Sequence, residues 1–151
     1  MRQLKIIILM VLCFACTSVS VQAMDVERLA IITKDGTSHV FQVEVAREDN
    51  DRQRGLMFRQ VLDEDKGMLF EFDPPYVVTM WMKNTQLPLD MVFIFKDGTI
   101  AHIAERTKPF SLDVVSAGVP VSGVLEIRGG LAQKLGIAVG DKVEHGFFVT
   151  N

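Results

Sequence analysis

The one tryptophan of the chain, Trp81, is followed by a polar run, Lys83 to Gln86, that separates two apolar stretches. Packing gives no reason for such a run, because turns usually obtain their polarity from Gly, Asp or Ser. An indole beside an ammonium, an amide and a hydroxyl offers a stacking face and hydrogen-bonding groups for a sugar ring, a base or a cation. We therefore predict a ligand site at Trp81, Lys83, Asn84 and Thr85, with a Trp81 packed in the core as the alternative.

Three charged residues elsewhere in the chain could complete this site. Arg54 and Arg59 flank an apolar triplet and could hold a carboxylate or phosphate by forked hydrogen bonds, or pair with acidic neighbours. Asp90 could bind the ligand with them, lock its own loop by accepting backbone N–H bonds, or act as a base. As a base it is a weak candidate, because no second carboxylate, nucleophile or histidine stands at a telling spacing.

Metal and cofactor chemistry have little support in the sequence. Met80 and Met82 would point to one face of a strand, so they are weak candidates for a two-sulfur Cu(I) site under Trp81, although methionine also fills core gaps. The three histidines lack zinc-site spacing. Phosphate-binding, dinucleotide-binding and nucleophile-elbow motifs are not found. We expect no cofactor.

The first 23 residues have the pattern of a secretory signal peptide. Arg2 and Lys5 precede an apolar run from Ile6 to Ala15, and the segment ends in small residues with Ala23. Cleavage there would leave a single domain at 24–151, of 151 − 23 = 128 residues. We therefore expect an exported protein, periplasmic or secreted.

Both cysteines, Cys13 and Cys16, fall inside this signal. The mature chain would then have no thiol, which excludes disulfides and cysteine nucleophiles. Lipidation of Cys16 is the less favoured alternative, because bulky Phe14 and Cys13 fit a lipoprotein signal poorly.

The charge of residues 24–151 argues against a nucleic-acid partner. Two of the 16 basic residues lie in the signal, so 14 basic residues face 19 acidic ones, a formal charge of −5. A nucleic-acid interface needs a clustered basic face instead. We expect a monomer whose partner is an unknown small molecule, with no transmembrane segment once the signal is removed.

Short β-rich segments separated by turns dominate the rest of the chain. Lys34-Asp35-Gly36-Thr37 recurs as Lys96-Asp97-Gly98-Thr99, and Asp-Gly turns of this kind close hairpins. No βαβ spacing is present, so the fold should be α+β and mainly β, a curled antiparallel sheet or small barrel with two short helices. The expected strands are 26–33, 39–45, 67–72, 76–82, 89–95, 100–105, 119–127 and 142–150, and the expected helices are 49–57 and 129–135.

Six motifs, in this order, resemble the domain of unknown function 192 family, also called uncharacterised protein family 0127. They are Arg54-Gly55-Leu56-Met57-Phe58-Arg59, Gly67-Met68-Leu69-Phe70, Trp81-Met82-Lys83-Asn84-Thr85 with Pro88-Leu89-Asp90, Asp97-Gly98-Thr99-Ile100, Val124-Leu125-Glu126 and Gly140-Asp141. The resemblance covers about residues 26–149. It implies a compact, barrel-like β domain and brings no settled activity or catalytic residue. Met80 stands where an aromatic residue commonly precedes the Trp.

The sequence as a whole indicates an exported ligand-binding or accessory protein. Three alternatives remain open. One is a small hydrolase or lyase that uses Asp90 with Arg54 or Lys83. The others are a Met/Trp copper-binding protein and a structural or protein-interaction module.

Overall fold

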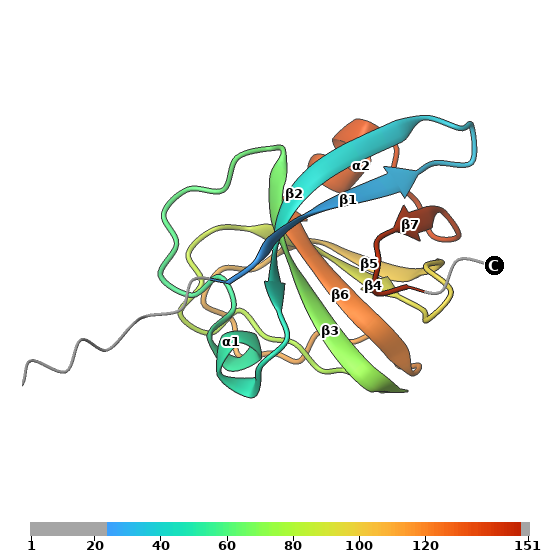
Figure 1. The fold of residues 1–151 in the computed structure, drawn as a ribbon. Coiled ribbons are helices and arrows are strands. Elements are labelled where there is room, and N and C mark those ends of the chain that lie inside the picture. The colour runs from blue at the N-terminus through green and yellow to red at the C-terminus, as the bar shows by residue number, and fades with distance from the viewer. Residues whose placement is uncertain (1–23, 149–151) are drawn as a thin grey trace, which may run out of the picture.

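The computed structural model describes residues 24–148, which form one curled seven-stranded sheet with two short helices (Figure 1). The predicted signal peptide, with Cys13 and Cys16, lies outside the described residues. The strand order is β5-β4-β6-β3-β2-β1-β7. The elements are β1 (Val26–Ile32), β2 (Ser38–Ala46), α1 (Asp49–Arg54), β3 (Lys66–Tyr76), β4 (Leu89–Ile94), β5 (Ile100–Thr107), β6 (Val121–Arg128), α2 (Leu131–Leu135) and β7 (Lys142–Glu144).

The fold is mainly β, and the sheet curls into a half-barrel, which confirms the predicted class. The two Asp-Gly turns close the hairpins β1–β2 and β4–β5. The sheet is mainly antiparallel, as expected, and its one parallel pair is β2 with β3. A parallel pair needs a crossover connection, and the segment that carries α1 supplies it. Between residues 24 and 148, no helix is long and apolar enough to cross a membrane.

The sheet buries side chains on both of its faces. Successive residues of a strand point to opposite faces, and β6 shows this clearly. Leu125 and Ile127 join one apolar cluster with residues of α2 and β7. Val124 joins a second cluster with Phe70, Met91 and the segment that follows α1. Because β6 is buried on both faces, each of its side chains points into a buried layer. A polar residue in β6 therefore cannot simply face water.

The predicted strand 76–82 does not form. β3 instead continues through Asp73-Pro74-Pro75 as far as Tyr76, with an irregular register after Glu71. Beyond it, Met80 makes an isolated bridge with Val115. The 77–88 connection makes two further backbone hydrogen bonds with the loop that follows β5, from the Met82 N–H to the Ser111 carbonyl and from the Phe110 N–H to the Thr85 carbonyl.

Two further boundaries differ from expectation, and one agrees with it. The first helix ends at Arg54 because Gly55 takes a positive φ of 48°. The last strand, predicted to reach Thr150, is the short β7, which ends at Glu144. Helix α2 forms where predicted and is closed by Gly136 in the left-handed conformation, at φ 70°.

The two ends of the strand order meet where β7 contacts the β4–β5 turn. The Val143 N–H donates to the Gly98 carbonyl at 2.8 Å, and the Ile100 N–H donates to the Asp141 carbonyl at 2.9 Å. This contact closes one end of the curled sheet. It also requires a glycine at position 98, because a Cβ there would lie 2.5 Å from the Val143 carbonyl oxygen.

The twin turns provide a matched test of this closure. Gly36 and Gly98 have nearly equal φ values, 85° and 80°, but a Cβ at Gly36 would meet nothing within 4 Å. Gly36→Ala should therefore cost about 1 kcal/mol for backbone strain alone. Gly98→Ala adds a backbone clash and should cost about 3 kcal/mol in urea unfolding. Equal losses would show that the contact with Val143 contributes nothing to closure.

Candidate functional site

A cavity of about 380 Å³ lies between α1, the end of β3 and the connection that carries Trp81. The indole of Trp81 lines this cavity and remains 48% exposed, so it is open to solvent and not sealed in the core. The apolar part of the wall consists of Leu56, Met57, Phe70, Phe72, Tyr76, Val78, Met80 and Val114, and the polar part of Asp49, Arg52, Gln53, Arg54, Thr79, Thr85 and Glu126. A half-exposed indole on an apolar cavity can stack on a flat ligand.

Glu126 of β6 also lines the cavity, and it is the residue that sequence reasoning missed. Its side chain is on the same face as Val124, between Met68 of β3 and Met91 of β4 as cross-strand neighbours. The residue is only 4% exposed and makes no hydrogen bond or ion pair with any residue between 24 and 148. Burial with no compensating partner raises the pKa of Glu126 to about 8, so the carboxyl is protonated at neutral pH.

A signal for Glu126 was present in the sequence. The strand 121–128 is otherwise apolar or small apart from its ends, and a glutamate inside such a strand is rarely left unpaired. In the sequence, Glu126 is also the last residue of the motif Val124-Leu125-Glu126. The importance of Glu126 becomes clear only once the cavity is seen in the structure, because most buried carboxylates have a protein partner.

The two predicted arginines lie apart. Arg54, at the end of α1, is exposed, lines the cavity and forms no ion pair within the described part of the chain. Arg59 does not line the cavity, because its guanidinium donates to the Glu44 carboxylate at 2.7 Å. Only Arg54 is therefore placed to meet an anionic group of a ligand.

In the polar run after Trp81, Thr85 lines the cavity, whereas Lys83 and Asn84 do not. Thr85 lines the cavity, and its hydroxyl donates to the Lys83 carbonyl at 3.1 Å. Asn84 has a positive φ of 54° and places its amide 3.8 Å from the Met57 sulfur. The Lys83 ammonium lies 5.0 Å from the centre of the Trp81 ring. Lys83 and Asn84 thus shape the wall without lining the cavity.

Asp90 is fully buried and does not line the cavity. One oxygen accepts the N–H groups of Arg106 and Gly130 at 2.7 and 2.8 Å, and the other accepts the N–H of Ala132 at 2.9 Å. Two of these donors begin α2, so a carboxylate from β4 caps the helix. This is the structural role that the sequence left open, and it leaves no free oxygen near Arg54 or Lys83.

The two candidate copper ligands are also separated. Met80 lines the cavity, whereas Met82 is 1% exposed and its sulfur lies 3.1 Å from the Thr107 hydroxyl. The segment is not a strand, so the two sulfurs do not share a face in the way the sequence suggested. No group of three or more His, Cys, Asp or Glu residues within 24–148 could hold a metal ion.

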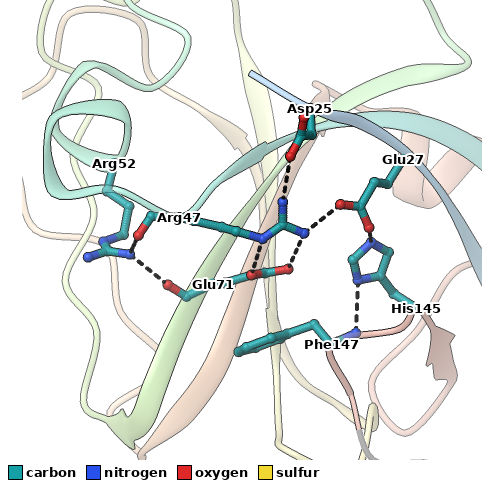
Figure 2. Close-up of polar contacts among 7 residues, drawn as sticks. All are labelled: Asp25, Glu27, Arg47, Arg52, Glu71, His145 and Phe147. Carbon is teal, nitrogen blue, oxygen red and sulfur yellow. Dashed lines mark hydrogen bonds and ion pairs between the residues drawn. The ribbon is translucent and has the colours of Figure 1, made fainter. Parts of the chain in front are cut away.

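An ion-pair network holds α1, and with it one wall of the cavity, against the sheet (Figure 2). Arg47 follows β2 and donates to the Glu71 carboxylate of β3 at 3.0 Å, and it also pairs with Glu27 of β1. The Arg47 hydrogen bond is the main reason that the pKa of Glu27 is lowered. Arg52 of α1 donates to the backbone carbonyl of Glu71 at 3.2 Å and to that of Arg47.

The network ends at His145, whose side chain is 2% exposed. Its Nε2 lies 3.1 Å from a carboxylate oxygen of Glu27, close enough for an ion pair although not aligned for a hydrogen bond (Figure 2). This contact links the segment after β7 to β1. Arg52 is committed to the network and also lies 5.8 Å from the Phe72 ring, which leaves Arg54 as the cation at the cavity mouth.

Comparison with known proteins gives a family and no activity. Residues 30–145 match the DUF192 family, described as "Uncharacterized ACR". No curated protein matches the chain. A solved structure of a "putative transcription regulator" from Sinorhizobium meliloti 1021 is 43% identical with a TM-score of 0.80, covering 82% of this chain and 95% of that one.

A second solved structure is a protein of unknown function from Novosphingobium aromaticivorans DSM 12444. It is 40% identical with a TM-score of 0.79, covering 83% of this chain and 89% of that one. The agreement extends over most of both chains. The protein belongs to the DUF192 family.

Proposed function

We propose that this protein binds a small molecule in the cavity beside Trp81. The observation that carries the proposal is a buried carboxyl, Glu126, that faces a cavity of about 380 Å³ and has no partner among the described residues. Because Glu126 is only 4% exposed, a bound molecule that hydrogen-bonds its carboxyl would do so in a largely desolvated site, where such a bond is stronger than in water. Pockets that are apolar with a few polar groups are the usual form of small-molecule sites.

The chemistry of the walls supports binding more than catalysis. Asp90 directs both oxygens to backbone amides, and no histidine or cysteine of the described residues lines the cavity with Glu126; the other acid there, Asp49, is exposed on α1. An acid–base reaction requires a positioned second group or an activated water. We therefore assign a binding or accessory role. The signal-like residues 1–23 support placing that role outside the cytoplasm.

The name of the Sinorhizobium protein does not extend to this chain. Residues 24–151 of this chain carry 14 basic and 19 acidic groups. Binding to nucleic acid depends instead on neutralising phosphates with clustered Lys and Arg.

Trp81 makes the proposal testable, because it is the single tryptophan and its emission reports the cavity alone. We expect emission to shift when purified protein is titrated with at least one class among monosaccharides, nucleosides, aromatic amines and aromatic carboxylates. Trp81→Ala should weaken the binding of that probe by tenfold or more in calorimetry, since stacking on an aromatic ring contributes about 1–3 kcal/mol.

Phe110→Ala is the matched control. Phe110 is 62% exposed and does not line the cavity, so this variant should bind the probe as the unaltered protein does. Failure of every probe class to change the emission or give heat would refute the proposed function. Equal losses in both variants would refute the assignment of the site to Trp81.

A further inference from the structure

We infer that the ligand places a protonated amine on Glu126 and an anionic group toward Arg54. This inference rests on the proposed function and names the class of molecule bound. It starts from the depths of the two charges. Glu126 is 4% exposed at the sheet face of the cavity, whereas Arg54 is exposed at the end of α1. The acidic group therefore lies deep and the basic group lies at the mouth.

The deep wall offers acceptors and aromatic faces, and few donors. The cavity that Glu126 faces is also lined by Phe70, Phe72 and Trp81, whose rings attract cations through their negative faces. The Thr85 hydroxyl already donates its proton to the Lys83 carbonyl, so its oxygen remains an acceptor. Arg52, the cation beside the Phe72 ring, already donates to the carbonyls of Arg47 and Glu71, whereas an ammonium would find a carboxylate, a hydroxyl oxygen and aromatic rings.

The protein itself shows that this indole holds an ammonium. Lys83 places its Nζ 5.0 Å from the centre of the Trp81 ring, within the range of a cation–π contact. A ligand amine would use the same ring chemistry from the cavity side. Lys83 cannot satisfy Glu126, because its side chain is exposed and does not line the cavity.

Binding of a cation should release the proton that Glu126 holds in the unliganded protein. Glu126 is neutral at pH 7, with a pKa of about 8 caused by desolvation, and an ammonium favours the ionised carboxylate. The other titratable or charged side chains that face the cavity are Asp49, Arg52 and Arg54 of α1 and Tyr76 of β3. All four lie nearer to solvent than Glu126, so the proton that leaves is the one on Glu126.

Three probes of similar size separate the contribution of the ligand's amine to binding from that of its anionic group. Benzylamine carries the cation, benzyl alcohol is its neutral counterpart, and 4-(aminomethyl)benzoate adds an anionic group at the far end of the ring. We expect benzylamine to bind at least tenfold more tightly than benzyl alcohol at pH 7. Its affinity should rise by up to tenfold from pH 6 to pH 7, with release of about one proton per ligand. Calorimetry in buffers of different ionisation enthalpy counts that proton.

Two variants assign the charges to residues. Glu126→Gln should abolish the preference for benzylamine over benzyl alcohol and the proton release. Arg54→Gln, at an exposed position, should weaken 4-(aminomethyl)benzoate by about threefold to tenfold and leave benzylamine unchanged. Circular dichroism confirms that each variant is folded before the titration.

The failures can be told apart. If the amine and the alcohol bind equally and both require Trp81, the cation assignment is overturned and the binding function stands. If a carboxylate without an amine, such as benzoate, binds more tightly than benzylamine, the inferred orientation of charges is wrong. If none of these probes binds while a sugar or nucleoside shifts the emission, the amine class is overturned. If nothing binds at all, the inference and the proposed function fail together.

Discussion

Glu126→Gln is expected to be more stable than the unaltered protein at pH 9, by on the order of 4–5 kcal/mol. The pKa of Glu126 is about 8 in the fold, against 4.5 for an ordinary glutamate, and each pKa unit corresponds to about 1.4 kcal/mol. Since domains are stable by only about 5–15 kcal/mol, this is a large fraction of the whole. Urea unfolding at several pH values would measure it.

The sign of the effect follows from proton binding. Between pH 4.5 and about 8 the folded protein keeps a proton on Glu126 that the unfolded chain has lost, so the free energy of unfolding falls as pH rises. The stabilising contribution is fully present below pH 4.5 and is lost by about pH 8. Glutamine does not titrate, so the two proteins should differ little at pH 4 and increasingly above pH 5. A difference that is independent of pH would contradict the buried, unpaired carboxyl.

Glu71→Gln is the matched control, and it should act in the opposite direction. Glu71 is also a buried glutamate on a central strand, 8% exposed, but its carboxylate pairs with Arg47 at 3.0 Å (Figure 2). Removing its charge leaves Arg47 with a weakened partner, so we expect a loss of about 1–3 kcal/mol at pH 7. Two glutamates of similar burial then differ in sign because only one has a partner.

Asp90→Ala should destabilise the protein by about 3–5 kcal/mol. The substitution leaves three backbone N–H groups, those of Arg106, Gly130 and Ala132, without their acceptor in a buried site. Hydrogen bonds to a charged group contribute about 1.5–3 kcal/mol each, and orphaned donors add a desolvation penalty. Asp90→Asn should cost somewhat less, because one oxygen remains while an NH2 group faces an amide donor. The midpoint of urea unfolding at pH 7 checks both.

Asp113→Asn serves as the control for loss of a carboxylate. Asp113 is exposed and hydrogen-bonds the Ser111 hydroxyl at 2.8 Å in the loop after β5, so its replacement should change stability by less than about 0.5 kcal/mol. If folded Asp90→Asn protein still binds the probe that shifts Trp81 emission, the residue acts in the fold. A specific loss of binding in a stable Asp90 variant would instead restore it to the ligand site.

The local features of the fold could be predicted because their causes are local. Gly36 and Gly98 adopt positive φ in Asp-Gly turns, and the flanking β-branched segments pair across them as hairpins. Gly136 ends α2 for the same backbone reason. The mainly β class and the family followed from these signals and from the motifs around Trp81.

The pairing of distant segments could not be predicted in this way. Alternation of apolar residues shows that a strand has a buried face, but it does not choose the neighbouring strand or its direction. The parallel β2–β3 pair and the isolated Met80–Val115 bridge both depend on contacts between residues far apart in the chain. The strand expected at 76–82 does not form, because this segment pairs with the loop after β5 and not with a strand of the sheet.

The candidate site likewise has features that the sequence predicted and features that only the tertiary structure determined. Residue types alone directed attention to Trp81, Lys83, Asn84, Thr85, Arg54, Arg59 and Asp90, because aromatic, charged and hydrogen-bonding groups can all bind ligands. The partners of these residues are determined only by the tertiary structure. Arg59 pairs with Glu44, and Asp90 accepts hydrogen bonds from the start of α2. The tertiary structure also leaves Glu126 facing a cavity without a partner. Burial and pairing set a carboxyl's charge, and both arise from segments that are distant in sequence.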